Sequence, residues 1–258
     1  MPDADWLSLE TARSENRILA ALPAEEFERI MPLLEPLDLP TSRNLYELGE
    51  PITHVYFVHR GVASLMTPMK DGPPIELATV GAEGMVGMPV FLCDDRMPSR
   101  AFMQVPGHGA RMEADAFRAF VRGSPVLNRV LLRYALALMT QMAQNAACNR
   151  THSVEERCAR WLLMTQDRVR SPTFELTQEF LAQMLGVRRP TVSIAAGILA
   201  QAGLISYVRG RITILDRSEL EAACCECYRI IATEFERLLG VPVERSEAPP
   251  PEDAGRKR

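Results

Sequence analysis

The segment 177–215 constrains the fold more than any other part of the chain. It contains two short apolar stripes at helical spacing, and Gly186 and Pro190 lie between them. Thr177 suits the N-cap of a first helix, Gly186 suits its end, and Pro190 is tolerated in the first turn of a second helix. The segment therefore predicts a helix over 178–185, a tight turn, and a second helix that runs from Pro190.

Two β-branched runs follow this pair of helices. They cover residues 205–208 and 211–215, and Arg209-Gly210 stands between them. A two-residue connection that contains Gly is typical of a tight hairpin. The whole segment is thus predicted to be a helix-turn-helix that carries a two-stranded wing.

The charge of this segment indicates its partner. No Asp or Glu occurs from 180 to 215, yet four Arg do, in a chain whose formal net charge is −4. A local basic surface is what contact with a phosphate backbone requires. The alternatives are a solvated charged face and a helical end that docks protein. We expect double-stranded DNA as the partner, contacted by Thr177, Gln178, Arg188, Arg189, Thr191, Ser193, Arg209 and Arg211.

At these residues the sequence resembles the Crp/Fnr family. The most specific part is LAQMLGVRRPTV at 181–192, which is similar to the family's helix-turn-helix signature, and the resemblance extends from about 16 to 239. It implies a homodimeric, sequence-specific transcription regulator that binds a near-palindromic DNA site and is not an enzyme. RNA polymerase is a further candidate partner under this resemblance.

Composition and the N-terminal sequence limit the number of domains and the location that can be expected. With 258 residues, 47% hydrophobic and 24% charged, the chain is long enough for two domains. Its acidic N-terminus does not look like a signal peptide, and its apolar runs are far shorter than a bilayer span. We therefore expect a cytoplasmic protein with no membrane contact, whose six cysteines are reduced thiols.

The pattern along the N-terminal half predicts a rolled sheet. A short helical lead-in over 16–34 is followed, from residue 37, by short β-rich runs punctuated by glycines. The expected fold class is α+β. The family resemblance implies that the rolled sheet is a cyclic-nucleotide-binding-like β-roll (jelly roll), joined to the winged helix-turn-helix. The expected parts are an N-terminal tail at 1–15, a β-roll sensor domain at 16–123, a dimerisation helix at 124–152, the winged helix-turn-helix domain at 153–240 and a disordered tail at 241–258.

A long helix should follow Pro125. Its apolar and polar residues repeat at alternating steps of four and three, as the a and d positions of a coiled coil do. The alternative is a helix buried within one protomer. Polar residues on such a stripe favour a dimer, because they fix register. The predicted interface is Leu127, Leu131, Tyr134, Leu138, Gln141 and Asn145, with Cys148 next on the same stripe.

The resemblance also locates an effector pocket. Family members that bind cyclic AMP use a Gly-Glu for the ribose, an Arg followed by a hydroxyl residue for the phosphate, and a hydroxyl pair on the dimer helix. In this sequence Gly87 is followed by Met88 instead of Glu, and Ser99 comes before Arg100 instead of after it. Met142 occupies one position of the hydroxyl pair. We expect a pocket at these five positions that is not tuned to cyclic AMP, because Met88 cannot accept a sugar hydroxyl. The effector and any cofactor are left open.

The cysteines offer an alternative function. Cys224 and Cys227 would share one face of a helix and could hold a soft metal or form a redox pair, with Cys225 between them. Two further ligands are not evident nearby in the sequence, so no metal site is predicted. A thiol- or metal-responsive sensor stays an alternative. Iron–sulfur members of the family carry their cysteines ahead of the β-roll. The first cysteine here is Cys93, so the resemblance does not imply an iron–sulfur centre.

Enzyme motifs are missing from the sequence. There is no phosphate-binding Gly loop and no nucleophile elbow. His54 and His59 stand an odd number of residues apart on a predicted strand, so they should point to opposite faces. We therefore predict no catalytic residues.

Overall fold

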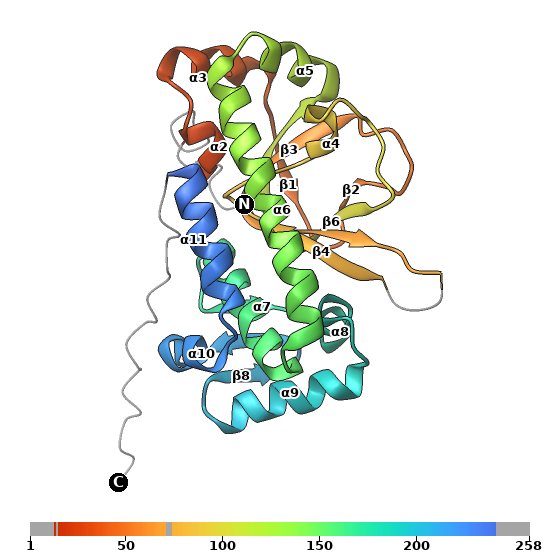
Figure 1. The fold of residues 1–258 in the computed structure, drawn as a ribbon, viewed down its shortest axis with the longest axis vertical. Helices are drawn as coiled ribbons and strands as arrows, with labels where there is room; N and C mark the ends of the chain where they lie inside the picture. Colours follow the sequence, from red (N-terminus) through yellow and green to blue (C-terminus); the bar gives the residue numbers. More distant parts are fainter. Residues whose placement is uncertain (1–12, 14, 71–73, 241–258) are drawn as a thin grey trace.

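The computed structural model describes residues 13, 15–70 and 74–240. The long helix α6 (Pro125–Thr151) runs through the molecule, with a β-roll on one side, α11 (Cys227–Leu239) on the other and the helix-turn-helix at one end (Figure 1). Among the described residues, no helix has the length and apolar character needed to span a bilayer. Most of the N-terminal tail and the tail predicted at 241–258 lie outside these residues.

The predicted rolled sheet is confirmed. Its strands are antiparallel in the order β1-β6-β3-β4, with β2 paired to β6 and β5 to β3. Gly61 is required where β3 and β6 bend together, because a Cβ there would lie 2.7 Å from the Val105 carbonyl oxygen. The strands are β1 (Glu35–Leu39), β2 (Asn44–Tyr46), β3 (His54–Thr67), β4 (Ile75–Val80), β5 (Met85–Val86) and β6 (Arg100–Glu113).

Short helices surround the roll and lead into α6. The predicted lead-in forms as two helices and a 3-10 turn, and Ser124 caps α6 by accepting a hydrogen bond from the Leu127 backbone N–H at 3.0 Å. Ser153 and Glu156 form a capping box at the start of α7. The elements are α2 (Arg17–Ala20), α3 (Ala24–Ile30), η2 (Met31–Leu33), α4 (Met88–Phe91), α5 (Ala114–Arg122) and α7 (Val154–Val169).

The helix-turn-helix and wing form as predicted. Thr177 accepts a hydrogen bond from the Phe180 backbone N–H, and Gly186 ends α8 in the left-handed conformation with φ 62°. Arg209 and Gly210 both have positive φ, as a tight hairpin between the wing strands requires. The elements are α8 (Gln178–Leu185), α9 (Arg189–Gln201), β8 (Ile205–Val208) and β9 (Arg211–Ile214).

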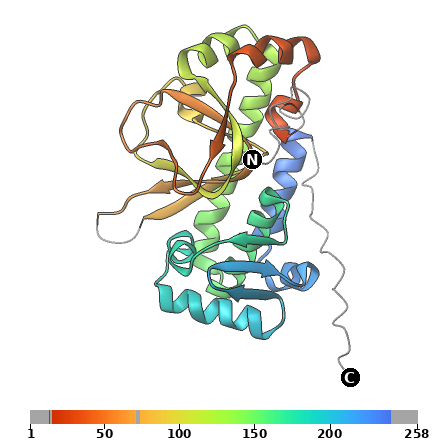
Figure 2. The same ribbon diagram turned by 180° about the vertical axis from the view of Figure 1, so that it is seen from behind.

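A third strand of the wing sheet was not predicted. The strand β7 (Thr173–Glu175) pairs with β9, so the sheet order is β7-β9-β8, and this sheet lies beside α9 (Figure 2). Three residues are too few to show an alternating pattern in the sequence.

The segment after the wing forms two helices, so the expectation that Cys224 and Cys227 share one helix face is wrong. The chain forms α10 (Arg217–Ala223), whose N-cap is Asp216, and then breaks before α11. Cys224 has extended backbone at this break, so Cys224 and Cys227 do not lie on one helix. The break turns the chain so that α11 can run back along α6 (Figure 1).

The predicted dimer seam is also wrong in its placement. Its six residues are buried inside their own protomer, with Leu127, Leu131, Tyr134 and Gln141 fully covered. They therefore offer almost no surface to a partner subunit. Tyr134 instead packs against Phe235 of α11, with ring centroids 6.4 Å apart, and its hydroxyl donates to the Met85 carbonyl oxygen at 3.0 Å.

The polar residues on this stripe have a different role from the predicted one. Strand β4 is at the edge of the sheet, so some of its backbone groups need partners from outside the sheet. Asn145 donates to the Leu77 carbonyl oxygen at 2.9 Å, and Gln141 donates to the Thr79 carbonyl and hydroxyl oxygens at 3.3 and 3.1 Å. Gln141 and Asn145 thus fasten α6 to its own β-roll.

Candidate DNA interface and effector cavity

Helix α9 has one buried face and one exposed face. The buried face packs into the helix-turn-helix core and consists of Val192, Ala195, Ala196 and Leu199. Arg189, Ser193 and Ile194 are exposed, and Ile194 is exposed at 63%. A helix with exposed side chains at its N-terminal end has the geometry that enters a major groove. Ile194 was not among the predicted contact residues, although its position on this face follows from helical spacing.

The N-terminal ends of α8 and α9 are joined by a side-chain hydrogen bond. The Ser193 hydroxyl lies 2.9 Å from the Gln178 side-chain oxygen and 3.2 Å from the Arg189 carbonyl oxygen. The structure therefore brings Thr177 and Gln178 at the start of α8 close to the start of α9. Arg188 and Arg189 are exposed there, and Thr191 is half-buried.

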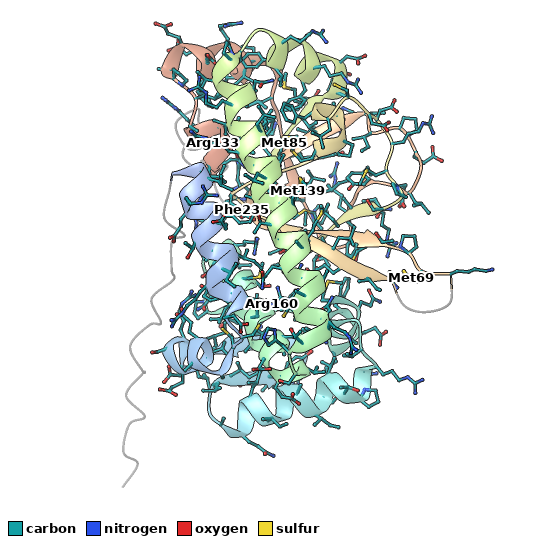
Figure 3. All side chains as sticks on the ribbon, in the orientation of Figure 1. Met69, Met85, Arg133, Met139, Arg160 and Phe235 are labelled. Atoms are coloured by element: carbon teal, nitrogen blue, oxygen red, sulfur yellow. The ribbon has the colours of Figure 1, made fainter. Side chains whose placement is uncertain are left out.

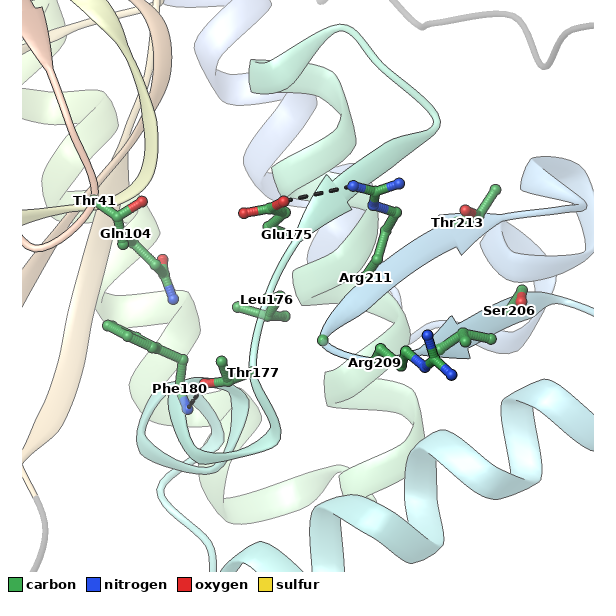
Figure 4. A pocket seen from close by; sticks show the side chains of 12 residues that line it. Thr41, Gln104, Glu175, Leu176, Thr177, Phe180, Ser206, Arg209, Arg211 and Thr213 are labelled. Carbon is green, nitrogen blue, oxygen red and sulfur yellow. Dashed lines mark hydrogen bonds and ion pairs between the residues drawn. The ribbon is translucent and has the colours of Figure 1, made fainter.

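The wing presents the other two predicted contact residues. Arg209 and Arg211 are exposed and line a cleft of about 640 Å³ between the wing and the β-roll, together with Gln104 and Phe180 (Figure 4). Arg211 lies 3.6 Å from the Glu175 carboxylate, in a pair that is largely exposed. Such a pair contributes little to stability, so Arg211 can exchange this partner for a phosphate at small cost.

A second cavity lies between the β-roll and α6. Its volume is about 270 Å³, close to the small end of the range for ligand pockets. Four of the five predicted pocket residues line it, and Arg100 does not. The predicted residues in its wall are Gly87, Met88, Ser99 and Met142; the unpredicted ones include Tyr46, Leu65, Leu77, Leu138 and Met139.

The polar groups of this cavity are poorly placed for a cyclic phosphate. Ser99 is buried and forms a hydrogen bond with Tyr46, whose pKa is raised by burial. Arg100 instead lies over the Phe102 ring, 5.2 Å from its centroid. The cation nearest the cavity is Arg96, which sequence reasoning missed, and it donates to the Gly49 carbonyl oxygen at 2.7 Å. Asp94 lies in the same wall and would repel a phosphate.

A buried polar cluster joins the β-roll to the DNA-binding end. Glu76 of β4 accepts from the Ser64 hydroxyl at 2.8 Å and from the Trp161 indole N–H of α7 at 3.1 Å. Burial raises the pKa of Glu76 to about 7, although these hydrogen bonds and the nearby Arg160 oppose the shift. The guanidinium of Arg168 lies 2.8 Å from Glu83, in a second buried contact between the same two parts.

Comparisons with known proteins agree with this architecture. The family model for the cyclic nucleotide-binding domain matches residues 37–124, and the model for the Crp-like helix-turn-helix domain matches residues 156–223. The CRP-like cAMP-activated global transcriptional regulator of Mycobacterium tuberculosis is 26% identical over 193 residues, which cover 72% of this chain and 86% of that protein.

Solved structures show the same fold. FixK2 from Bradyrhizobium japonicum has a TM-score of 0.61 and 16% identity, covering 74% of this chain and 98% of the other. A CRP-family transcriptional regulator from Thermus thermophilus has a TM-score of 0.60 and 20% identity, covering 82% and 99%. With both domain models matched and the fold shared, the chain belongs to the Crp/Fnr family of transcription regulators, which bind DNA and are not enzymes.

Proposed function

We propose that this regulator acts as a homodimer that reads a near-palindromic DNA site and responds to an apolar effector, or to none, rather than to cyclic AMP. The observation that supports a dimer is a second apolar stripe on α6. This stripe is exposed, whereas the predicted stripe is buried. It consists of Leu132, Leu136, Met139, Ala143 and Ala146. Leu132, Leu136 and Met139 are exposed at 55%, 48% and 65%.

The spacing of this exposed stripe fits a two-helix coiled coil. Its members alternate in steps of four and three, which is the a and d repeat. The small side chains of Ala143 and Ala146 would let two copies of α6 approach closely at one end. A contiguous exposed apolar stripe is typical of an interface. Met139, labelled in Figure 3, belongs to the stripe and also lines the cavity, so a partner helix would lie against the mouth of that cavity.

The chemistry of the cavity carries the proposal on the effector. A cyclic nucleotide loses water from its phosphate and ribose on entering a closed site, so each polar group needs a partner there. The wall of this cavity offers Met88 and Met142 where acceptors and hydroxyls would be needed, and its cation is already engaged at the surface. The M. tuberculosis relative is described as cAMP-activated. We therefore expect that cyclic AMP does not activate this chain.

Selecting bound duplexes from a random pool tests the DNA-binding part of the proposal. The enriched sequences should contain two inverted half-sites about one helical turn apart, because two copies of α9 would enter successive major grooves. Affinity for the selected duplex should fall steeply as salt rises. A pool that shows no enrichment would contradict the proposed sequence-specific site. Contact with RNA polymerase stays a prediction from the family resemblance.

We expect α9 to read the bases and the wing to contact the phosphate backbone. Replacing Arg189 by Ala is expected to cost about 1–3 kcal/mol on the selected duplex and to relax base preference at one position. Replacing Arg209 by Ala should weaken binding to all duplexes alike and reduce the salt dependence. Fluorescence anisotropy on selected and scrambled duplexes measures both effects. Equal losses on the two duplexes for both variants would refute this division.

Cyclic AMP is not expected to switch the protein. Each polar group left unpaired in a closed cavity costs about 1–3 kcal/mol, which removes one or two decades of affinity. Calorimetric titration of the full chain should therefore show no micromolar binding, and operator affinity should not change with the nucleotide. Micromolar affinity coupled to tighter DNA binding would show that the cavity accepts the nucleotide without the usual carboxylate.

A further inference from the structure

The structure brings together four side chains that are far apart in the sequence. Cys148 and His152 come from the end of α6, and Cys225 and Cys227 come from the break between α10 and α11. Their ligand atoms, three Sγ and one imidazole nitrogen, all lie within 4.8 Å of one another. The three cysteines are almost fully buried, and the His152 side chain is 17% exposed.

The distances in this cluster match those around one tetrahedral metal ion. The Cys148 and Cys225 sulfurs are 3.5 Å apart, and the Cys227 sulfur lies 3.5 Å from His152 Nδ1. Ligands at typical Zn–S and Zn–N bond lengths on a tetrahedron are separated by roughly 3.5–3.8 Å. A disulfide would need the two sulfurs at about 2.05 Å, and it would leave the convergence of Cys227 and His152 unexplained.

The surroundings of the cluster suit bound thiolates and a bound imidazole. Gln144 donates a hydrogen bond to the Cys227 sulfur at 3.1 Å. The second imidazole nitrogen of His152 lies 3.2 Å from the Glu226 carboxylate, which would direct Nδ1 toward a metal. Three thiolates, one neutral imidazole and one divalent ion carry a net charge of −1, and the cationic Arg160 lies close enough to interact with Cys148.

We propose that Cys148, His152, Cys225 and Cys227 form a Cys3His site for one Zn²⁺ ion. Three sulfurs and one nitrogen in a tetrahedral arrangement favour zinc, and four protein ligands leave no open position for a reacting water. The site is therefore structural. The sequence-based prediction of no metal site missed it because two of its ligands precede the other pair by more than seventy residues.

The position of the site gives it a mechanical role. His152 is the C-cap of α6, and α7 starts directly after it with Ser153 as its N-cap. A metal bound here would tie the connection between the β-roll part and the DNA-binding part to the start of α11. It would thus hold α11, which carries Phe235 (labelled in Figure 3), against α6. Phe235 packs there on Tyr134, with ring centroids 6.4 Å apart.

Metal analysis of the full chain tests the site. The protein should be purified under reducing conditions without chelators and analysed for zinc by mass spectrometry, with about one ion per chain expected. Cys225→Ser and Cys227→Ser should lose most of this zinc. The matched control is Cys224→Ser, because Cys224 is adjacent in the chain but outside the cluster, with its thiol 3.3 Å from the Glu221 carbonyl oxygen. This variant should retain the ion.

A milder variant covers the case in which the serine variants fail to fold. Glu226 is 68% exposed at its side chain, so Glu226→Gln should fold normally and weaken zinc up to roughly tenfold in competition with a chelator. Cobalt substitution should give thiolate-to-metal charge-transfer absorption in the wild type and in Cys224→Ser. Chelation should speed hydrogen exchange along α11.

Three results would overturn the proposal. One is folded, reduced wild-type protein that takes up neither zinc nor cobalt. Another is equal metal loss in Cys224→Ser and Cys225→Ser. The third is a Cys148–Cys225 disulfide found by peptide mapping of the native protein without reductant. None of these measurements depends on DNA binding, so they succeed or fail independently of the proposed operator and effector.

Discussion

Replacing Leu132 and Leu136 together by Glu is expected to give a folded monomer with greatly weakened binding to the selected DNA site. Both side chains are about half exposed in the protomer, so the protomer should tolerate charge there. In the proposed dimer each would face its own copy, and four like charges would be buried without partners. Losing the second DNA-binding unit should lower operator affinity by roughly 100-fold or more, because the two half-sites would no longer be bound as one.

The contrasting variant is Leu131→Glu, one position away on the same helix. Leu131 is fully buried against the protomer's own core, so a charge there should destabilise the fold itself. Light scattering and thermal unfolding separate the two effects. The exposed pair should change mass with little change in melting temperature, and Leu131→Glu should lower the melting temperature strongly. A Leu132→Glu and Leu136→Glu protein that remains dimeric would contradict the interface proposed on α6.

The two stripes of α6 show what sequence periodicity cannot decide. Both repeat in steps of four and three, so both satisfy the coiled-coil pattern, and a helix with two apolar faces has two possible partners. The choice depends on the edge of β4, whose carbonyl oxygens accept hydrogen bonds from Gln141 and Asn145. Contacts with residues distant in sequence therefore bury the stripe that contains Gln141 and Asn145 within the protomer. The stripe around Leu136 is left exposed.

Local signals, by contrast, were sufficient for the helix-turn-helix. Thr177 and Gly186 start and end α8 as predicted, and the Arg209-Gly210 turn has the backbone that a tight hairpin requires. The cavity was predicted in part, because Met88 lies in its wall but the cation beside it is Arg96 rather than Arg100. Which of the two arginines lies at the cavity depends on how the loop before β6 folds, and the sequence pattern does not specify that loop.

Glu76→Gln is expected to remove a large pH dependence of stability. The pKa of Glu76 is raised from 4.5 to about 7 in the folded protein. The folded state therefore binds the proton more tightly than the unfolded chain does, so stability is highest below about pH 4.5 for this group and falls as pH rises through about 7. The shift corresponds to about 3 kcal/mol lost at high pH. Glutamine resembles the protonated acid, so the variant should be the more stable protein at pH 8.

Urea unfolding from pH 5 to 8 gives the free energy of unfolding of the wild type and of Glu76→Gln as a function of pH. The difference between the two profiles isolates the contribution of Glu76, because the other titrating groups contribute equally to both. Trp161→Phe is the matched perturbation, because it removes the indole N–H that donates to the carboxylate at 3.1 Å and should move the fall in stability to higher pH. Glu76 lies on β4 and Trp161 on α7, so the contact between the β-roll and the DNA-binding end provides part of the burial that opposes ionisation of this carboxyl. Parallel profiles for wild type and Glu76→Gln would show that the carboxyl is ionised throughout this range and that Arg160 compensates for its burial.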